Sequence, residues 1–220
     1  MALFIPGTTT SNVHLTYSAP AGQDWTVMCW GYLSALTPAN YRNWISIEPY
    51  LGMGTDSNGY TFDAGTLANN FDGIALSAGR WYHMCETIRS GGSTTSHYIC
   101  GYLNGKPQVI NVLDTETFTA YTGITIGNYA TGGNNCPING GVRDVRIWTR
   151  ILELEEVIRE MYSPRPLAPG LLLWSPFDDD IYTDKSGNGH LWTANGTAQV
   201  LQSGPLIPWS WNKTKKTTNI

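Results

Sequence analysis

The stretch Gly140–Tyr162, GGVRDVRIWTRILELEEVIREMY, changes its apolar period half-way along and decides the fold. From Val142 to Thr149 apolar and polar residues come close to alternating, which is the period-2 pattern of a half-buried β-strand. The apolar residues that follow fall at i, i+3, i+4 and i+7, the stripe of a short amphipathic helix that ends before Pro164; they are Leu154, Val157, Ile158 and Met161. The stretch therefore predicts a strand that runs directly into one short helix.

The same stretch resembles a pattern found in laminin G-like and pentraxin-like domains of the concanavalin A-like jelly-roll superfamily. That pattern reads G-x-[hydrophobic]-D-[D/E]-[hydrophobic]-R-[hydrophobic]-[aromatic]-x-R-x-L, followed by E-E-[hydrophobic]. The residues that stand in its places are Gly141, Val142, Asp144, Val145, Arg146, Ile147, Trp148, Arg150, Leu152, Glu155, Glu156 and Val157. The resemblance implies an all-β fold, a concanavalin A-like jelly-roll β-sandwich of two antiparallel sheets with one short helix near residues 153–162.

Other segments match the family in the same order along the chain. Trp25–Leu33, WTVMCWGYL, resembles a strand of the family, and we predict a central strand with Trp25, Val27 and Cys29 on one face and Met28, Trp30 and Tyr32 on the other. Trp81 stands in a G-x-W-x-H strand entrance, and Ile124–Asn128 resembles the strand that precedes the Gly141 motif. Asn104 and Gly105 predict a tight hairpin, since Asn-Gly is the strongest short-range hairpin signal.

Composition limits the class of protein. Nine Trp, twelve Tyr and 24 Gly, with only 14% charged residues, suit many strands joined by tight turns. The net charge of −4 offers no basic patch, so nucleic acid is not an expected partner. No apolar run is long enough to cross a membrane, and the first residues, MALFIPGTTTSN, do not have the pattern of a secretory signal. We therefore expect synthesis in a cytoplasm.

The chain length suits one domain. We predict a single laminin G-like sandwich over residues 1–204, in which the block 170–200 completes the same sandwich because the two chain ends of such folds lie close together. Residues 205–220, PLIPWSWNKTKKTTNI, form a polar tail with little core potential. Trp209 and Trp211 in this tail either dock on a neighbouring molecule or pack back on their own sandwich.

The cysteines are Cys29, Cys85, Cys100 and Cys136, and their spacing does not match a metal site. A hairpin centred on residues 90–95 would place Cys85 directly opposite Cys100, which leaves a disulfide geometrically possible. The alternative interpretation is a set of free, buried thiols in a reducing compartment.

The sequence offers candidate residues for three kinds of site. Asp114-Thr115-Glu116 is the closest approach to the carboxylate run of a laminarinase-type glycosidase, and we interpret it as a solvated loop, so no catalytic residue is predicted. Calcium is the one possible cofactor, and its hard oxygen ligands would be Asp178, Asp179, Asp180, Asp184 and Asn188; the alternative is a structural turn. Sugars could stack on aromatic residues in loops or at strand ends, namely Tyr41, Trp44, Tyr50, Tyr60 and Tyr129, unless these belong to the core.

A lone domain of this type resembles modules of tailed-phage virions. We therefore predict a non-enzymatic virion structural protein, a capsid decoration or fibre-associated module with a lectin-like fold that contacts host glycans. The expected partners are other virion proteins such as the major capsid protein, glycans and further copies of the chain, and the expected location is the virion, without membrane attachment. The alternatives are a stand-alone carbohydrate-binding lectin and, as the weakest, a glycoside hydrolase.

Overall fold

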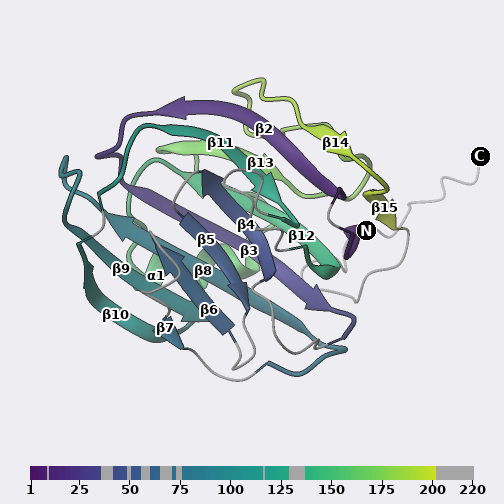
Figure 1. The fold of residues 1–220 in the computed structure, drawn as a ribbon, viewed down its shortest axis with the longest axis horizontal. Coiled ribbons are helices and arrows are strands. Elements are labelled where there is room, and N and C mark those ends of the chain that lie inside the picture. Colours follow the sequence, from purple (N-terminus) through teal and green to yellow (C-terminus); the bar gives the residue numbers. More distant parts are fainter. Residues whose placement is uncertain are drawn as a thin grey trace, which may run out of the picture.

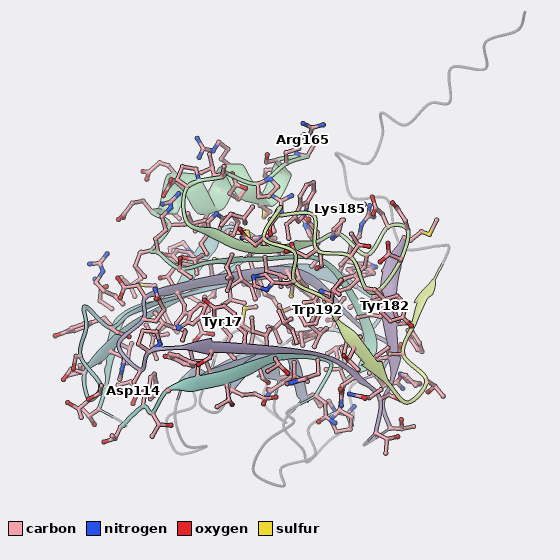
Figure 2. All side chains as sticks on the ribbon, turned by 90° about the horizontal axis from the view of Figure 1, so that it is seen from above. Tyr17, Asp114, Arg165, Tyr182, Lys185 and Trp192 are labelled. Atoms are coloured by element: carbon pink, nitrogen blue, oxygen red, sulfur yellow. The ribbon has the colours of Figure 1, made fainter. Side chains whose placement is uncertain are left out.

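In the computed structural model two antiparallel β-sheets lie face to face, and one short helix covers the outer side of one of them (Figures 1 and 2). The structure describes residues 1–8, 10–35, 42–48, 51–55, 60–64, 71–72, 76–115, 117–128 and 137–201. This arrangement confirms the predicted all-β jelly-roll sandwich. Among the described residues, no helix has the length and apolar character needed to span a lipid bilayer.

Counting the described strands, the larger sheet has eight, in the order β10-β9-β8-β3-β12-β1-β15, with β13 paired to β12. They are β1 (Ala2–Pro6), β3 (Trp25–Leu33), β8 (Trp81–Arg89), β9 (His97–Leu103), β10 (Lys106–Asp114), β12 (Asn139–Trp148), β13 (Leu171–Ser175) and β15 (Gln199–Leu201). β3 is central, as predicted. Trp25, Val27 and Cys29 belong to the core between the sheets, whereas Met28 packs in the cluster on the helix side.

The second sheet has seven described strands in the order β14-β2-β11-β4-β5-β6-β7. They are β2 (Asn12–Ala19), β4 (Arg42–Glu48), β5 (Leu51–Thr55), β6 (Tyr60–Ala64), β7 (Phe71–Asp72), β11 (Tyr121–Ile126) and β14 (Thr193–Asn195). The C-terminal block contributes β13 and β15 to the larger sheet and β14 to the smaller one. Gly7, with φ of +73°, lies between β1 in one sheet and β2 in the other.

The β9–β10 hairpin has the predicted two-residue turn. Leu103 pairs with Lys106, and Asn104 and Gly105 have φ of +52° and +72°. Positive φ at both central residues is the geometry of a type I′ turn, whose twist matches that of the flanking strands. The Asn104 side chain also accepts a hydrogen bond from the His83 backbone N–H at 2.9 Å, which ties the turn to β8.

The β8–β9 hairpin differs from the prediction in its register. Cys85 pairs with Tyr102, and Cys100 pairs with Thr87, so the two cysteines are not directly opposite each other. The loop between the strands covers residues 90–96, and Asp24 Oδ1 fixes its start by accepting the Ser90 N–H at 2.7 Å. The thiols of residues 29, 85 and 100 are free, and residue 136 lies outside the described residues. Burial raises the pKa of the Cys85 thiol well above its ordinary value.

The strand β12 is buried on both faces, so the prediction of a half-buried strand was wrong in this respect. Its residues Arg143, Asp144 and Arg146 are all buried. The register shifts between Arg143 and Arg146, so that an extra residue opposes β3 and forms a β-bulge in which Asp144 has φ of +54°. The polar side of β12 is buried because the helix α1 (Leu154–Tyr162) and the segment after it lie over it.

The guanidinium of Arg146 is fully enclosed, with 0% of the residue exposed, and it uses every N–H it has. Nε and Nη2 contact the two carboxylate oxygens of Asp144 at 3.1 and 2.8 Å. Nη1 donates to the backbone and carboxylate oxygens of Glu160 at 2.9 and 3.0 Å. Nη2 also donates to the Ser163 carbonyl at 2.6 Å. One side chain of β12 therefore holds both the last turn and the end of α1.

The first turn of α1 is fixed by Glu156. Its two carboxylate oxygens each accept a hydrogen bond from the Arg150 guanidinium at 2.8 Å, and these bonds lower the pKa of Glu156 to about 2. Glu156 Oε2 also accepts the backbone N–H of Glu153 at 3.1 Å, which supplies a partner for an N–H at the helix start. The Arg150–Glu156 pair, which stands in an R-x-L-x-x-x-E spacing, thus holds the first turn of the helix against the end of β12.

We expect Arg146→Met to lower the free energy of unfolding by roughly 3–5 kcal/mol, because it leaves the carboxylates of Asp144 and Glu160 buried without their cation. Urea denaturation measures this change. The matched control is Arg159→Met, since Arg159 lies 3.7 Å from the same Glu160 carboxylate but its side chain is 55% exposed, and its loss costs below about 1 kcal/mol. Equal losses in the two variants would contradict the assignment.

Candidate functional site

The outer face of the smaller sheet carries a row of small and polar residues at matching register positions. Thr193 of β14 pairs with His14 of β2, His14 with Thr125 of β11, Thr125 with Ser46 of β4, and Ser46 with Gly52 of β5. The residues on either side of this row along each strand are apolar and belong to the core between the sheets. Because successive residues of a strand point to opposite faces, the row lies on the face turned away from the core.

A hydrogen-bond chain connects three strands within this row. The Thr125 hydroxyl donates to the Glu48 carboxylate, and His14 Nδ1 lies 2.9 Å from the same hydroxyl oxygen. Since the single hydroxyl hydrogen goes to Glu48, we assign the proton of the bond between the imidazole and the hydroxyl to His14 Nδ1. Glu48 and Thr125 are buried, whereas 28% of the His14 side chain is exposed. His14 is therefore the accessible end of a chain anchored by Glu48.

Glycines make room for the polar side chains of this face. A Cβ on Gly123 would lie 2.6 Å from His14 Cε1, and a Cβ on Gly52 would lie 3.0 Å from the Asn43 amide nitrogen. The Asn43 amide donates to Ser46 Oγ at 3.2 Å, and Ser46 Oγ donates to the Asn128 carbonyl at 3.2 Å. The side chains are thus held in fixed orientations by one another, and Asn43 and Ser46 are themselves buried.

The positions of the carboxylates Glu48 and Asp114 differ. Glu48 lies on the outer face of the smaller sheet, and Asp114 lies in the larger sheet and not in the solvated loop that we expected. Among the described side chains on the outer face of the smaller sheet, Glu48 carries the only carboxylate. Asp114 is the last residue of β10 in the other sheet; it is 1% exposed and pairs with His97, so the loop interpretation was wrong for this residue. Burial lowers the pKa of His97, and the negative charge of Asp114 opposes that shift. Glu116 lies outside the described residues.

One aromatic residue predicted for a sugar platform is in the core. Trp44 is 0% exposed, and a Cβ on Gly31 of β3 would meet its indole nitrogen at 2.7 Å. A register shift between Asn43 and Ile45 places Trp44 on the core side, so this prediction was wrong. Tyr60 begins β6, and its side chain is not described. The other predicted platform residues, Tyr41, Tyr50 and Tyr129, lie outside the described residues, as do Trp209 and Trp211 of the tail.

Two of the acids proposed for calcium are paired with a lysine. Lys185 Nζ lies 2.8 Å from Asp178 Oδ1 and 3.1 Å from Asp179 Oδ2. Asp180 Oδ1 accepts the backbone N–H groups of Tyr182 and Thr183, each at 2.7 Å. Across the described part of the chain, no group of three or more His, Cys, Asp or Glu side chains is placed to hold a metal ion.

The other two proposed ligands also bond to the surrounding backbone. Asp184 Oδ1 accepts the backbone N–H groups of Trp174 at 3.0 Å and Ser186 at 2.8 Å. Asn188 donates through its side chain to the carbonyls of Leu171 and Leu172 at 2.9 and 2.8 Å. These bonds fasten the loop to β13, which is the structural role weighed against calcium in the sequence. Calcium binding at these residues stays the untested alternative to this structural role.

The comparison with protein families gives one match, over residues 7–158, and it covers more than half of the chain. The chain belongs to the concanavalin A-like lectin/glucanases superfamily. The resemblance seen in the Gly141 motif is therefore confirmed for the family, and the two-sheet sandwich is the fold of a superfamily member. A comparison with curated proteins gives no match.

Solved structures place this superfamily member among lectin-like folds. It resembles a "putative carbohydrate binding protein" from Bacteroides ovatus with a TM-score of 0.63 and 17% identity over 88% of this chain, which spans 61% of that protein. It also resembles the heptameric SAP-like pentraxin of Limulus polyphemus with a TM-score of 0.58 and 17% identity, over 88% of this chain and 94% of the pentraxin. A Trypanosoma rangeli sialidase matches with a TM-score of 0.48 over 63% of this chain and 22% of the enzyme, too weakly to support an argument.

Sequence reasoning missed the polar row of the smaller sheet. A signal was present, since His14, Ser46 and Thr125 each sit between two apolar residues, as expected for the outward face of a half-buried strand. The three segments are far apart in the chain, and no local pattern indicates that β2 and β4 are both neighbours of β11. The row exists only because the sheet brings them together.

We expect Asp184→Ala to lower the free energy of unfolding by about 2 kcal/mol, because it removes an ionised acceptor from partly buried backbone donors. The matched control is Asp179→Ala, whose side chain is 59% exposed and forms one surface ion pair, and its loss costs below about 1 kcal/mol. Thermal unfolding with added Ca²⁺ or with a chelator should leave the melting temperature of the unmutated protein unchanged. A rise with Ca²⁺ would establish the metal site instead.

Proposed function

We propose that this protein is a non-enzymatic binding module whose lectin-like fold contacts glycans through the outer face of the smaller sheet. The observation that carries the proposal is the chain from His14 through Thr125 to Glu48, which ends in an accessible imidazole on a rigid sheet. A site for sugar hydroxyls needs donors and acceptors that are held in fixed orientations. Because the buried Glu48 carboxylate already orients its neighbours, little side-chain entropy is lost when a sugar binds.

A glycoside hydrolase is the less favoured function. Hydrolysis by the usual mechanisms needs a pair of Asp or Glu residues on either side of the scissile bond. In the described part of the outer face, Glu48 carries the only carboxylate, and the Thr125 hydroxyl donates a hydrogen bond to it. A single enclosed carboxylate supports binding better than acid–base chemistry.

We expect a glycan array to give saturable binding that His14→Ala weakens about tenfold, the loss of one good hydrogen bond. Glu48→Gln should weaken the same binding, because it removes the charge that orients Thr125. The matched control, Glu155→Gln in the exposed first turn of α1, should bind like the unmutated protein. Bound oligosaccharides should show no new reducing ends. Binding unaffected by both site variants, or hydrolysis abolished by Glu48→Gln, would contradict the proposal.

We further propose that the module works in a virion, as a capsid decoration or fibre-associated protein assembled with the major capsid protein and with copies of itself. The support is an analogy with laminin G-like domains of tailed-phage virions, together with a lectin-like fold suited to acting by contact. The alternative is a lectin that acts alone.

The virion proposal predicts that the protein co-purifies with assembled particles. Mass spectrometry of particles banded in a density gradient should find it at a constant ratio to the major capsid protein. The recombinant protein should form a defined oligomer by light scattering. A monomer that binds sugar and is absent from washed particles would instead establish the stand-alone lectin.

A further inference from the structure

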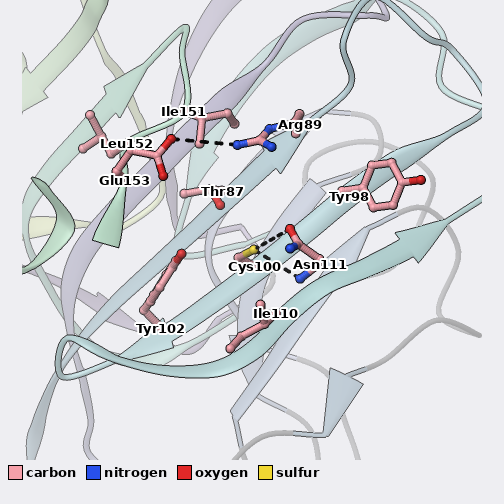
Figure 3. A pocket seen from close by; sticks show the side chains of 10 residues that line it. All are labelled: Thr87, Arg89, Tyr98, Cys100, Tyr102, Ile110, Asn111, Ile151, Leu152 and Glu153. Carbon is pink, nitrogen blue, oxygen red and sulfur yellow. Dashed lines mark hydrogen bonds and ion pairs between the residues drawn. The ribbon is translucent and has the colours of Figure 1, made fainter. Parts of the chain in front are cut away.

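A concave site lies on the opposite side of the molecule, on the outer face of the larger sheet where α1 begins. It is a groove of about 260 Å³ (Figure 3). Its walls come from Arg89 of β8, Tyr98 and Cys100 of β9, Asn111 of β10 and Glu153 just before the helix. The groove therefore shares no residue with the hydrogen-bond chain of the smaller sheet.

Asn111 is held in an unfavourable backbone conformation at this groove. It has φ of +49°, and it lies within the second of two register shifts of β10 against β9, the one between Val109 and Val112. Its backbone N–H donates to Cys100 Sγ at 3.3 Å, and its Oδ1 accepts from the same sulfur at 3.5 Å (Figure 3). The side-chain nitrogen makes no hydrogen bond within the described part of the chain. A left-handed residue with an unused amide nitrogen at a groove is a candidate for contact with a ligand.

The rim of the groove supplies opposite charges. Arg89 Nη2 and Glu153 Oε1 lie 3.9 Å apart, and their side chains are 55% and 73% exposed (Figure 3). An exposed pair at this separation contributes little to stability. Its donors and acceptors remain available to a ligand that carries neighbouring hydroxyl groups, because a guanidinium and a carboxylate together match the donor and acceptor of a diol.

Aromatic and aliphatic side chains also line the groove. Tyr98 is 46% exposed and Ile110 is 64% exposed, although both are large hydrophobic residues. Ile151 and Leu152 form the wall beside the helix start. An exposed tyrosine ring offers a flat apolar face to the C–H groups of a sugar, and the aliphatic side chains offer contact to a methyl group.

We propose that this groove is a second saccharide site, which takes one N-acylated hexosamine residue at the end of a glycan. The pyranose ring packs on Tyr98, ring hydroxyls bond to Arg89 and Glu153, the acetamido group pairs with the Asn111 amide, and its methyl group contacts Ile110. A volume of about 260 Å³ suits one sugar ring rather than a longer chain. With a site on each outer face of the sandwich, a single chain can bridge two glycan-bearing surfaces.

The test is a titration of ¹⁵N-labelled protein with N-acetylglucosamine, N-acetylgalactosamine and glucose, followed by amide chemical shifts. At least one N-acetylated sugar should bind with a dissociation constant on the order of 1 mM. Glucose should bind about tenfold more weakly, and the shifts should centre on residues 98 and 111. Shifts that centre on residues 14 and 125 would overturn this site while leaving the proposed function intact. Equal binding of glucose, or no shift at about 10 mM of either N-acetylated sugar, would overturn it as well.

Variants separate the site from a general effect on the fold. Tyr98→Ala and Asn111→Gly should each weaken binding about tenfold. Glycine accepts a positive φ, so Asn111→Gly removes the amide without straining the backbone. The matched control, Tyr182→Ala at a 54% exposed tyrosine, should leave this binding unchanged. Unchanged binding in both groove variants, or tighter binding of an N-acetylated dipeptide amide than of either N-acetylated sugar, would refute a saccharide site.

Discussion

The enclosed guanidinium of Arg146 is the constraint on which the arrangement of strand and helix depends. A charge removed from water is tolerated only when all of its hydrogen-bonding groups are satisfied, and here the five N–H groups find oxygens on Asp144, Glu160 and Ser163. Burial raises the pKa of Glu160, and the adjacent guanidinium opposes that shift. The bulge at Asp144 turns its carboxylate toward Arg146, and Trp174 Nε1 of β13 donates to the same carboxylate at 2.9 Å. One buried cation thus joins β12, β13 and α1.

The features that follow from local rules could be predicted from the sequence. Alternation placed Trp25 and Met28 on opposite faces of β3, and the Asn104-Gly105 pair specified its turn. The failures share a different cause. The Cys85 register depends on a loop that Asp24 caps from far away in the chain, and the position of Trp44 depends on a bulge against β5. A shift of the strand register by one residue moves a side chain to the other face of the sheet, and the local sequence pattern does not indicate such a shift.

The two outer faces of the sandwich carry different chemistry for a structural reason. The larger sheet is covered in part by α1, so its polar residues there must be paired internally or kept neutral. His83 is an example, because burial, with the nearby charge of Arg146, lowers its pKa to about 3, and its ring packs edge-on against Trp30. The smaller sheet instead carries glycines and short polar side chains, which cost little entropy to fix in place. Binding chemistry is therefore expected on the smaller sheet and wherever the helix leaves the larger one uncovered.

The uncovered part of the larger sheet ends at β10, and the same irregularity protects that edge and forms the groove. A long apolar edge strand is a template for pairing with other chains, and proteins prevent this with proline and with bulges. β10 has both, since Pro107 lacks an N–H and the register shifts twice between Pro107 and Val112. The second shift leaves Asn111 in its left-handed conformation with its amide turned to the groove. Regular pairing along β10 would remove that amide from the groove and at the same time expose an unprotected edge. The register shifts of β10 thus protect the edge of the sheet from pairing with other chains and also place the Asn111 amide at the groove.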